Sequence, residues 1–287
     1  MIPLILSILS SSVLLIIFKY FAKFKVNNFQ AITVNYAVAA GLGFFLSPIS
    51  YPVQQLLTKP WTLSAIVIGC VFIGMFYLMA LSSQKVGVAI SSVANKMSLV
   101  IPVIAGVVLY SESLAGLKLF GVVLALTAVI LVTFPKNKVE IERKYLFLPI
   151  IIFLGSGFLD TFFKYVQANQ LGEQEIGIFS SSLFLISALV GLIVMVIRRL
   201  ITGSTLEVKS IVAGFALGIP NYFSIHFLLN ALNLPNLEST VVFPVNNTGI
   251  VLLSTLLAII LFSEKLTKVN WAGILLAVIS IALIAIL

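Results

Sequence analysis

The sequence predicts an all-α integral membrane protein whose ten transmembrane helices form two inverted repeats of five helices. The first observation behind this prediction is composition. Of the 287 residues, 61% are hydrophobic and only 9% are charged, and the mean hydropathy is +1.20. Soluble domains carry roughly 25% charged residues, and a soluble chain could not bury this much apolar surface, whereas a bilayer accepts it.

The second observation is a series of apolar runs that are long enough to cross a bilayer, which takes about 20 residues per helix. The runs do not alternate between polar and apolar residues, so they predict helices and not barrel strands. Turn-forming residues such as Pro48, Pro60 and Pro235 separate them. The expected spans are residues 2–20, 31–48, 62–82, 86–109, 115–134, 146–166, 176–197, 209–230, 237–261 and 267–287.

The third observation is an internal repeat. A shift of 152 positions places Asn95 on Asn247 and Ser111–Leu114 on Ser263–Leu266. Such self-similarity indicates a duplication, so we expect a first repeat at 1–134, a cytoplasmic linker at 135–145 and a second repeat at 146–287. Five spans per repeat is an odd number, so the second repeat must insert upside down, as in many secondary transporters.

The basic residues predict the orientation. Thirteen of the seventeen Lys and Arg residues follow odd-numbered expected helices, whereas Lys59 and Lys118 follow even-numbered ones. Cytoplasmic loops carry the excess of Lys and Arg, so we expect a multi-pass protein of the cell inner (plasma) membrane with both termini outside. The basic residues lie at the ends of apolar runs and form no single patch, which argues against a nucleic-acid partner despite the net charge of +8.

The repeated segments also carry a family resemblance. Residues 80–134 and 230–287 each contain A-L, a proline, an apolar stretch, S-E-x-L and G-x-x-L-A. This arrangement resembles the drug/metabolite transporter superfamily, and most of all its ten-helix EamA-type branch. The resemblance implies that helices 1, 3, 4, 6, 8 and 9 line a central cavity, with helices 5 and 10 at the edge. It further implies export of amino acids and other small metabolites, or exchange of nucleotide sugars and sugar phosphates.

Two features depart from that family. Pro102 of the fourth helix aligns with Ser254, and Pro244 of the ninth helix aligns with Ser92, so the two proline kinks are not symmetric. Many relatives are thought to keep their termini in the cytoplasm, whereas the distribution of charges in this chain predicts the reverse.

Lys96 is the clearest candidate for binding a substrate. Ionisable residues inside a span are costly and mark functional sites, and Lys96 lies near the middle of the fourth expected helix, on a stripe with Ser92 and Asn95. We expect it to meet an anionic group of the substrate; the alternative is a lysine paired internally to hold two helices together. On the ninth helix, Asn247 beside Pro244 is expected to form a hydrogen-bonding wall of the same cavity.

Three carboxylates also have expected roles, each with groups close to it in the sequence. Asp160 is the only aspartate of the chain, and Lys164 follows it by one helical turn. The two side chains can pair at this i, i+4 spacing. Either they form a self-neutralised structural pair, or Asp160 carries a coupling proton. Glu112 and Glu264 are expected to cap the helices that follow them, since an acidic side chain suits a helix N-terminus.

The eighth expected helix carries Tyr222 and His226 on one face, with Pro220 and Asn221 expected to interrupt it near mid-membrane. We expect Asn221, Tyr222 and His226 to contact substrate, with a structural histidine as the alternative. No His, Cys or Glu lies at metal-ligand spacing from His226, so no metal is expected.

The leading function is therefore a secondary active transporter that exports a small polar metabolite, amino-acid-like or otherwise anionic or zwitterionic, by alternating access. An exchanger of a sugar phosphate or nucleotide-linked sugar, and a non-transporting accessory protein, are the alternatives. An enzyme is not expected, since the chain offers one His, one Cys and one embedded carboxylate. No phosphate-binding G-x-x-x-x-G-K-[ST] motif is present, so neither ATP nor another cofactor is expected. The expected partners are the substrate and the lipid bilayer, with the chain acting as a monomer or homodimer.

Overall fold

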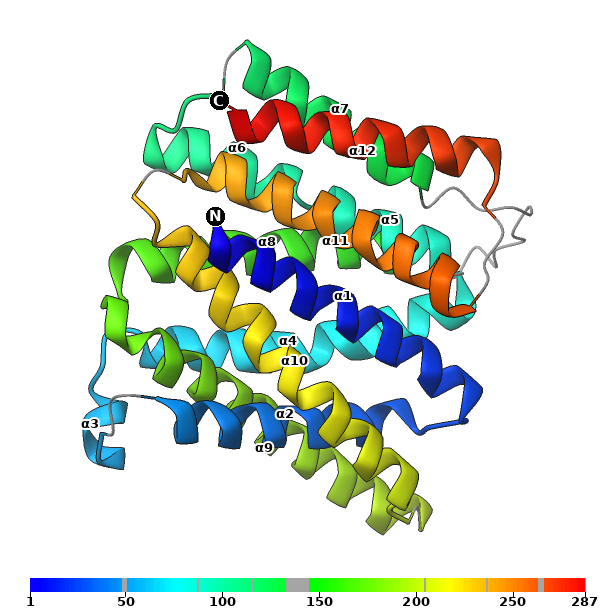
Figure 1. Cartoon of the computed structure of the whole chain (residues 1–287). Coiled ribbons are helices and arrows are strands. Elements are labelled where there is room, and N and C mark those ends of the chain that lie inside the picture. The colour runs from blue at the N-terminus through cyan, green and yellow to red at the C-terminus, as the bar shows by residue number, and fades with distance from the viewer. Residues whose placement is uncertain are drawn as a thin grey trace.

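The computed structural model describes residues 1–47, 51–86, 88–114, 116–132, 145–203, 205–235, 237–262 and 266–286. Across these ranges the regular secondary structure is helical throughout (Figure 1). The helices are α1 (Ile2–Lys23), α2 (Asn28–Leu46), α3 (Val53–Leu57), α4 (Thr62–Lys85), α5 (Val88–Met97), α6 (Val100–Tyr110), α7 (Leu117–Val132), α8 (Phe147–Asn169), η2 (Glu173–Glu175), α9 (Ile176–Thr202), α10 (Val208–Leu232), α11 (Ser239–Phe262) and α12 (Lys268–Ile286).

Each of the ten expected apolar runs coincides with helix, although the run at 86–109 is divided into α5 and α6. By length and composition, six of the described helices can cross a membrane: α2, the first part of α4, α8, α9, α10 and α11. Four shorter apolar helical stretches accompany them, at Ile2–Phe18, Ala94–Tyr110, Leu117–Val132 and Lys268–Leu283. The expected linker lies, up to residue 144, outside the described residues, as does the repeat motif at 263–265.

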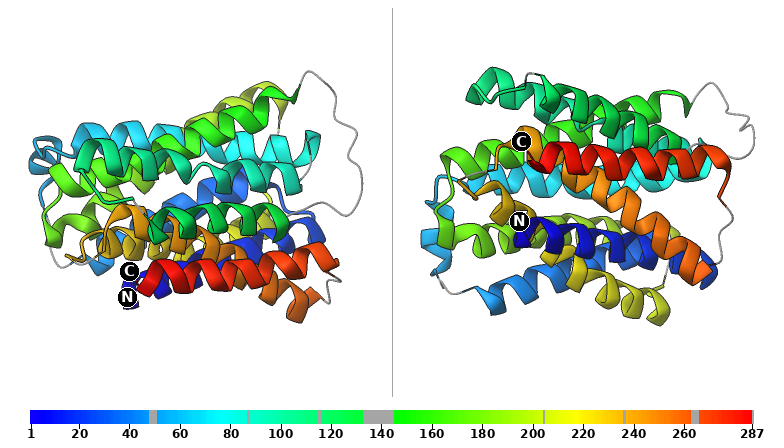
Figure 2. Two further views of the ribbon diagram at one scale, coloured as in Figure 1. Left: turned by 90° about the horizontal axis from the view of Figure 1, so that it is seen from above. Right: turned by 45° about the horizontal axis from the view of Figure 1, so that its top comes forward.

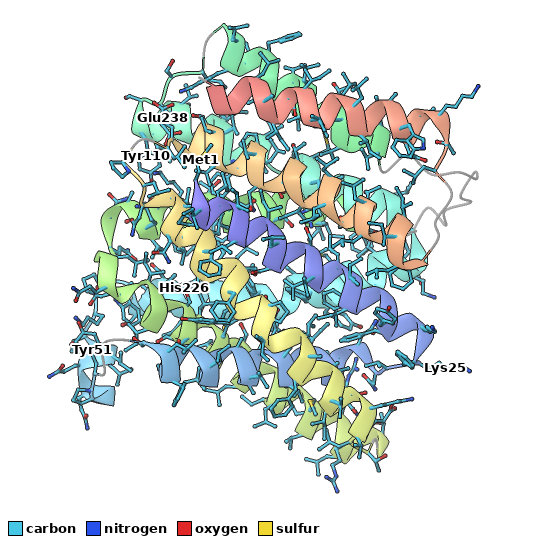
Figure 3. All side chains as sticks on the ribbon, viewed as in Figure 1. Met1, Lys25, Tyr51, Tyr110, His226 and Glu238 are labelled. Carbon is cyan, nitrogen blue, oxygen red and sulfur yellow. The ribbon has the colours of Figure 1, made fainter. Side chains whose placement is uncertain are left out.

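The long helices lie side by side and alternate in direction, so the loops gather at two ends of the bundle (Figures 1 and 2). Met1 lies at one of these ends, together with Tyr51, Tyr110 and Glu238, whereas Lys25 lies at the other (Figure 3). The last turn of α12 lies at the same end as Met1 (Figure 1). We call these the terminal end and the opposite end. Large apolar side chains such as Phe45, 85% exposed, and Leu200, 81% exposed, cover the outside. A surface of this kind is stable against lipid, and the protein is a membrane protein.

Helices from the two halves of the chain are interleaved. α1 packs on α10 and α11, α2 packs on α9 and α10, and α7 packs along α12. In the other direction, α8 packs on α4, α5 and α6, and α9 packs on α4. In chain order, the helices of the two halves correspond as follows: α1 to α8, α2 to α9, α4 to α10, α5 and α6 to α11, and α7 to α12. When each helix is replaced by its counterpart, the α1–α10 pair becomes α8–α4 and the α2–α10 pair becomes α9–α4. Both of these pairs are also packed in the structure.

The break between α5 and α6 follows from Pro102. Proline has no N–H and therefore cannot donate to the carbonyl of the residue four positions earlier, which is Ser98. The helix accordingly stops at Met97 and restarts at Val100. The carbonyl of Ser98 instead accepts a tighter bond from the backbone N–H of Ile101, at 3.0 Å. Pro220 and Pro244 do not interrupt their helices in this way, because α10 and α11 continue through them. The expected interruption at Pro220 and Asn221 is therefore wrong.

Close helix contact depends on Gly43, and we expect Gly43→Ala to destabilise the protein by about 1–3 kcal/mol through overpacking. A β-carbon at this position would lie 2.2 Å from the hydroxyl of Ser181 and 2.4 Å from the ring of Tyr222. The Tyr222 ring is buried and cannot move aside freely. Gly41→Ala is the matched control, because a β-carbon there meets nothing within 4 Å. Equal thermal unfolding midpoints for the two variants in detergent would contradict this packing argument.

Candidate functional site: a charged centre at a helix break

Lys96 occupies the last turn of α5, directly before the break. The C-terminal end of a helix carries a partial negative charge from its unpaired carbonyls, and a cation is stabilised there by roughly 0.3–1 kcal/mol or more. The break therefore gives the ammonium a favourable position inside an otherwise apolar segment. Broken helices of this kind are tolerated at membrane depth only where protein or a cavity surrounds them.

The structure brings together Lys96 and Asn247, the two residues that the sequence predicts at one site. Lys96 Nζ donates a hydrogen bond of 3.1 Å to Asn247 Oδ1. Asn247 is 8% exposed and lies near the middle of α11. The bond joins the fourth segment of the first half to its counterpart in the second half, so the relative position of the halves decides whether it forms.

Asp160 lies on α8, which packs against α5, the helix that carries Lys96. The expected pairing of Asp160 with Lys164 is not the arrangement found. Lys164 Nζ lies 3.9 Å from Glu112 Oε1 and donates to Gln167 Oε1 at 3.3 Å. The physical reason is that packing of α6 on α8 brings Glu112, just beyond the end of α6, within reach of Lys164. The long Lys164 stem can then extend toward the terminal end.

The other polar residues of α11 and α5 differ in whether they make hydrogen bonds. Asn246 Oδ1 and Thr248 Oγ1 are buried without a hydrogen-bond partner in the described part of the chain. The backbone carbonyl of Asn95 accepts the Ser98 hydroxyl at 2.5 Å. The side chain of Ser92 lies outside the described residues. We call the bonded pair of Lys96 on α5 and Asn247 on α11 the charged centre.

Asn221, Tyr222 and His226 form a separate group on α10. Asn221 Nδ2 donates to Asn35 Oδ1 of α2 at 3.0 Å, and both side chains are buried. The Tyr222 hydroxyl lies 3.4 Å from His226 Nδ1, and the two rings are stacked with centroids 5.4 Å apart. None of the described contacts of these three side chains reaches Lys96 or Asn247, so Asn221 serves the α2–α10 interface.

The role of Glu112 differs from the one expected from the sequence. Its carboxylate caps α11 and not the helix that follows it. Oε1 accepts from the backbone N–H of Ser239 at 3.1 Å, and Oε2 accepts from the backbone N–H of Thr240 at 2.8 Å. Ser111 makes this reach possible, because its left-handed backbone (φ 54°) turns the chain back at the end of α6. The counterpart Glu264 lies outside the described residues.

Two further ion pairs lie at the terminal end, at or near the ends of their helices. Lys59 Nζ lies 2.7 Å from Glu175 Oε1, and Trp61 Nε1 donates to Glu175 Oε2 at 3.3 Å. The hydrogen bond with Glu175 raises the pKa of Lys59. Burial works to raise the pKa of Glu175, but hydrogen bonds from Lys59 and from the backbone of Gly172 outweigh it and lower that pKa.

The second pair joins Lys118 Nζ to Glu238 Oε2 at 2.5 Å, and this hydrogen bond lowers the pKa of Glu238. A lowered carboxylate pKa means that the stabilisation is present above the ordinary pKa of the group and is lost as the pH falls through the lowered value. Both links are therefore intact at neutral pH.

Sequence reasoning missed these terminal-end contacts, and it expected a kink at Pro102 in one helix over 86–109 where the structure has a break between α5 and α6. The break had a signal, namely Pro102 four residues after Ser98. The ion pairs had none, because their partners are far apart in the chain. Within the described ranges, no group of three or more His, Cys, Asp and Glu residues could hold a metal ion.

Comparisons with known proteins show that the fold also occurs in another protein. No family model matches the chain. A protein of Haemophilus influenzae, described as uncharacterized, is 28% identical over 284 residues, which span 95% of this chain and 93% of that protein. A solved structure described only as the crystal structure of a protein superimposes with a TM-score of 0.80 over 99% of this chain and 96% of its own, at 13% identity. The helical fold described above is thus shared, nearly from end to end, with a protein of solved structure.

Proposed function

We propose that this chain is a secondary active transporter of the drug/metabolite transporter type, which moves a small polar metabolite with an anionic group by alternating access. Ten spans in two inverted five-helix repeats form the transport unit, in the cell membrane with both termini outside. The observation that carries the proposal is the charged centre, in which Lys96 at a helix break bonds to Asn247 of the other half.

The chemistry of the centre suits an anionic ligand. The ammonium of Lys96 provides a compact positive charge, and a charge-assisted bond to a carboxylate or phosphate is about twice as strong as a neutral one. Asn247 accepts a hydrogen bond from that ammonium, and we expect Asp160, on the neighbouring α8, to balance its charge. A proton taken up by Asp160 would release Lys96 for the substrate anion, which gives a route for proton coupling.

Two features of the fold support the transport part of the proposal. The principal helix contacts are reproduced when the halves are exchanged, as an inverted repeat requires. Broken helices near mid-membrane are also the usual location of substrate sites in such transporters.

A binding screen tests the proposal. The purified protein is heated with amino acids, dicarboxylates and sugar phosphates, each beside an analogue whose anionic group is esterified or amidated. A ligand at 100 times its Kd stabilises a protein by about 2.7 kcal/mol, so we expect certain anionic compounds, and not their neutral analogues, to raise the unfolding temperature. Lys96→Gln is the control and should lose the shift. A neutral analogue that stabilises the protein and Lys96→Gln equally would contradict an anion site at Lys96.

A further inference from the structure

The charge links at the terminal end share a feature that the charged centre does not explain. Each of them joins the first half of the chain to the second: Lys59 to Glu175, Lys118 to Glu238, and Glu112 to Lys164. Among the described residues, every ion pair between the halves lies at this end. In Figure 3, Glu238 and Tyr110 lie near Met1, far from Lys25.

The opposite end is joined differently. There the halves meet through neutral hydrogen bonds: the backbone N–H of Asn27 donates to the Ser210 hydroxyl at 3.0 Å, and Gln30 Nε2 donates to the carbonyl of Thr205 at 2.7 Å. The described ion pair at that end, between Lys209 and Glu207 at 3.2 Å, lies within the second half. Over the part of the chain that the structure describes, ion pairs therefore hold the two halves together at one end only.

The link at Glu112 also connects to the charged centre. Thr240, whose N–H Glu112 accepts, precedes Asn247 by seven residues, which places both on the same face of α11 two turns apart. Pro244 lies between them, and α11 continues through it without a break. Movement of the first turn of α11 can thus be passed to the bond between Asn247 and Lys96.

We infer that these three links form a charge lock, made of Lys59–Glu175, Lys118–Glu238 and Glu112–Lys164, which holds the terminal end closed and must open for solute to pass. The inference rests on the proposed function, because a lock matters only if access alternates between the two ends. Opening separates the halves at all three links while the neutral contacts at the opposite end can persist.

Labelling of a buried cysteine tests the lock. Val103→Cys is suitable, because Val103 is 2% exposed and lies one turn behind Gly106, where a β-carbon would meet Glu112 and Ser239. The single native cysteine, Cys70, is replaced by serine in every variant. In nanodiscs, we expect Glu238→Lys to accelerate the reaction of the introduced cysteine with a membrane-impermeant maleimide at least 10-fold, since a lysine at 238 repels Lys118 and removes that link.

Glu207→Lys is the matched control. Its side chain is 39% exposed against 40% for Glu238, and it reverses an ion pair that does not cross between the halves. Slow labelling should return in the swapped pair, Lys118→Glu with Glu238→Lys. Labelling of Glu238→Lys no faster than the control, or fast labelling that the swap does not reverse, would overturn the lock. The measurement uses no substrate, so its failure leaves the transport proposal standing, and a failed ligand screen leaves the lock standing.

Discussion

Replacing Lys96 with glutamine is expected to reduce uptake of the substrate into proteoliposomes by about 100-fold. The charge-assisted bond that an anionic substrate would make to the ammonium is worth about 3 kcal/mol, and every 1.4 kcal/mol is a factor of ten in affinity. Glutamine cannot supply that charge. Lys96→Arg should recover little transport, because a planar guanidinium fork does not replace a compact ammonium at the end of α5.

The packing of α8, which carries Asp160, against α5 makes a second outcome testable. If the Asp160 carboxylate is balanced by Lys96, as proposed above, Lys96→Gln leaves it without a cation, and an unpaired charge inside the protein is strongly destabilising. We therefore expect a lower unfolding temperature for Lys96→Gln, and recovery of that temperature but not of transport in Lys96→Gln with Asp160→Asn. Wild-type uptake by Lys96→Gln would show that Lys96 only holds helices together.

Glu112→Gln is expected to lower the free energy of unfolding by about 3 kcal/mol, which is the range for breaking a buried ion pair. Three losses combine in this variant. The amide places a donor against the N–H groups that start α11, the negative charge that favours a helix N-terminus disappears, and Lys164, 14% exposed, loses its nearest carboxylate. Unfolding of the purified protein in a denaturing detergent, followed by circular dichroism, measures the effect.

Glu238→Gln is the control within the same region. Glu238 also forms an ion pair between the halves, but its side chain is 40% exposed, and exposed pairs contribute about 1 kcal/mol or less. Adding Lys164→Met to Glu112→Gln should recover part of the loss by removing the unpaired cation. If Glu112→Gln unfolds like Glu238→Gln, the carboxylate of Glu112 does not anchor α11.

The sequence by itself determined where the helices lie. In lipid a backbone segment must satisfy its own hydrogen bonds, and a long apolar run leaves the helix as the available solution. Within the described residues, each of the ten runs accordingly contains helix. Their number as membrane spans and their inversion remain predictions. The sequence also singled out Lys96 and Asn247, because polar groups inside apolar runs are conspicuous and costly.

Only the tertiary structure decided which partners these groups take. The spacing of Asp160 and Lys164 permitted a pair within α8, yet Lys164 lies beside Glu112. Glu112 likewise caps α11 and not the helix that follows it. A local pattern states which contacts are within reach along one helix. The choice among them depends on which helices become neighbours, and that follows from the packing of many similar apolar surfaces over the whole bundle, which no single stretch of sequence encodes.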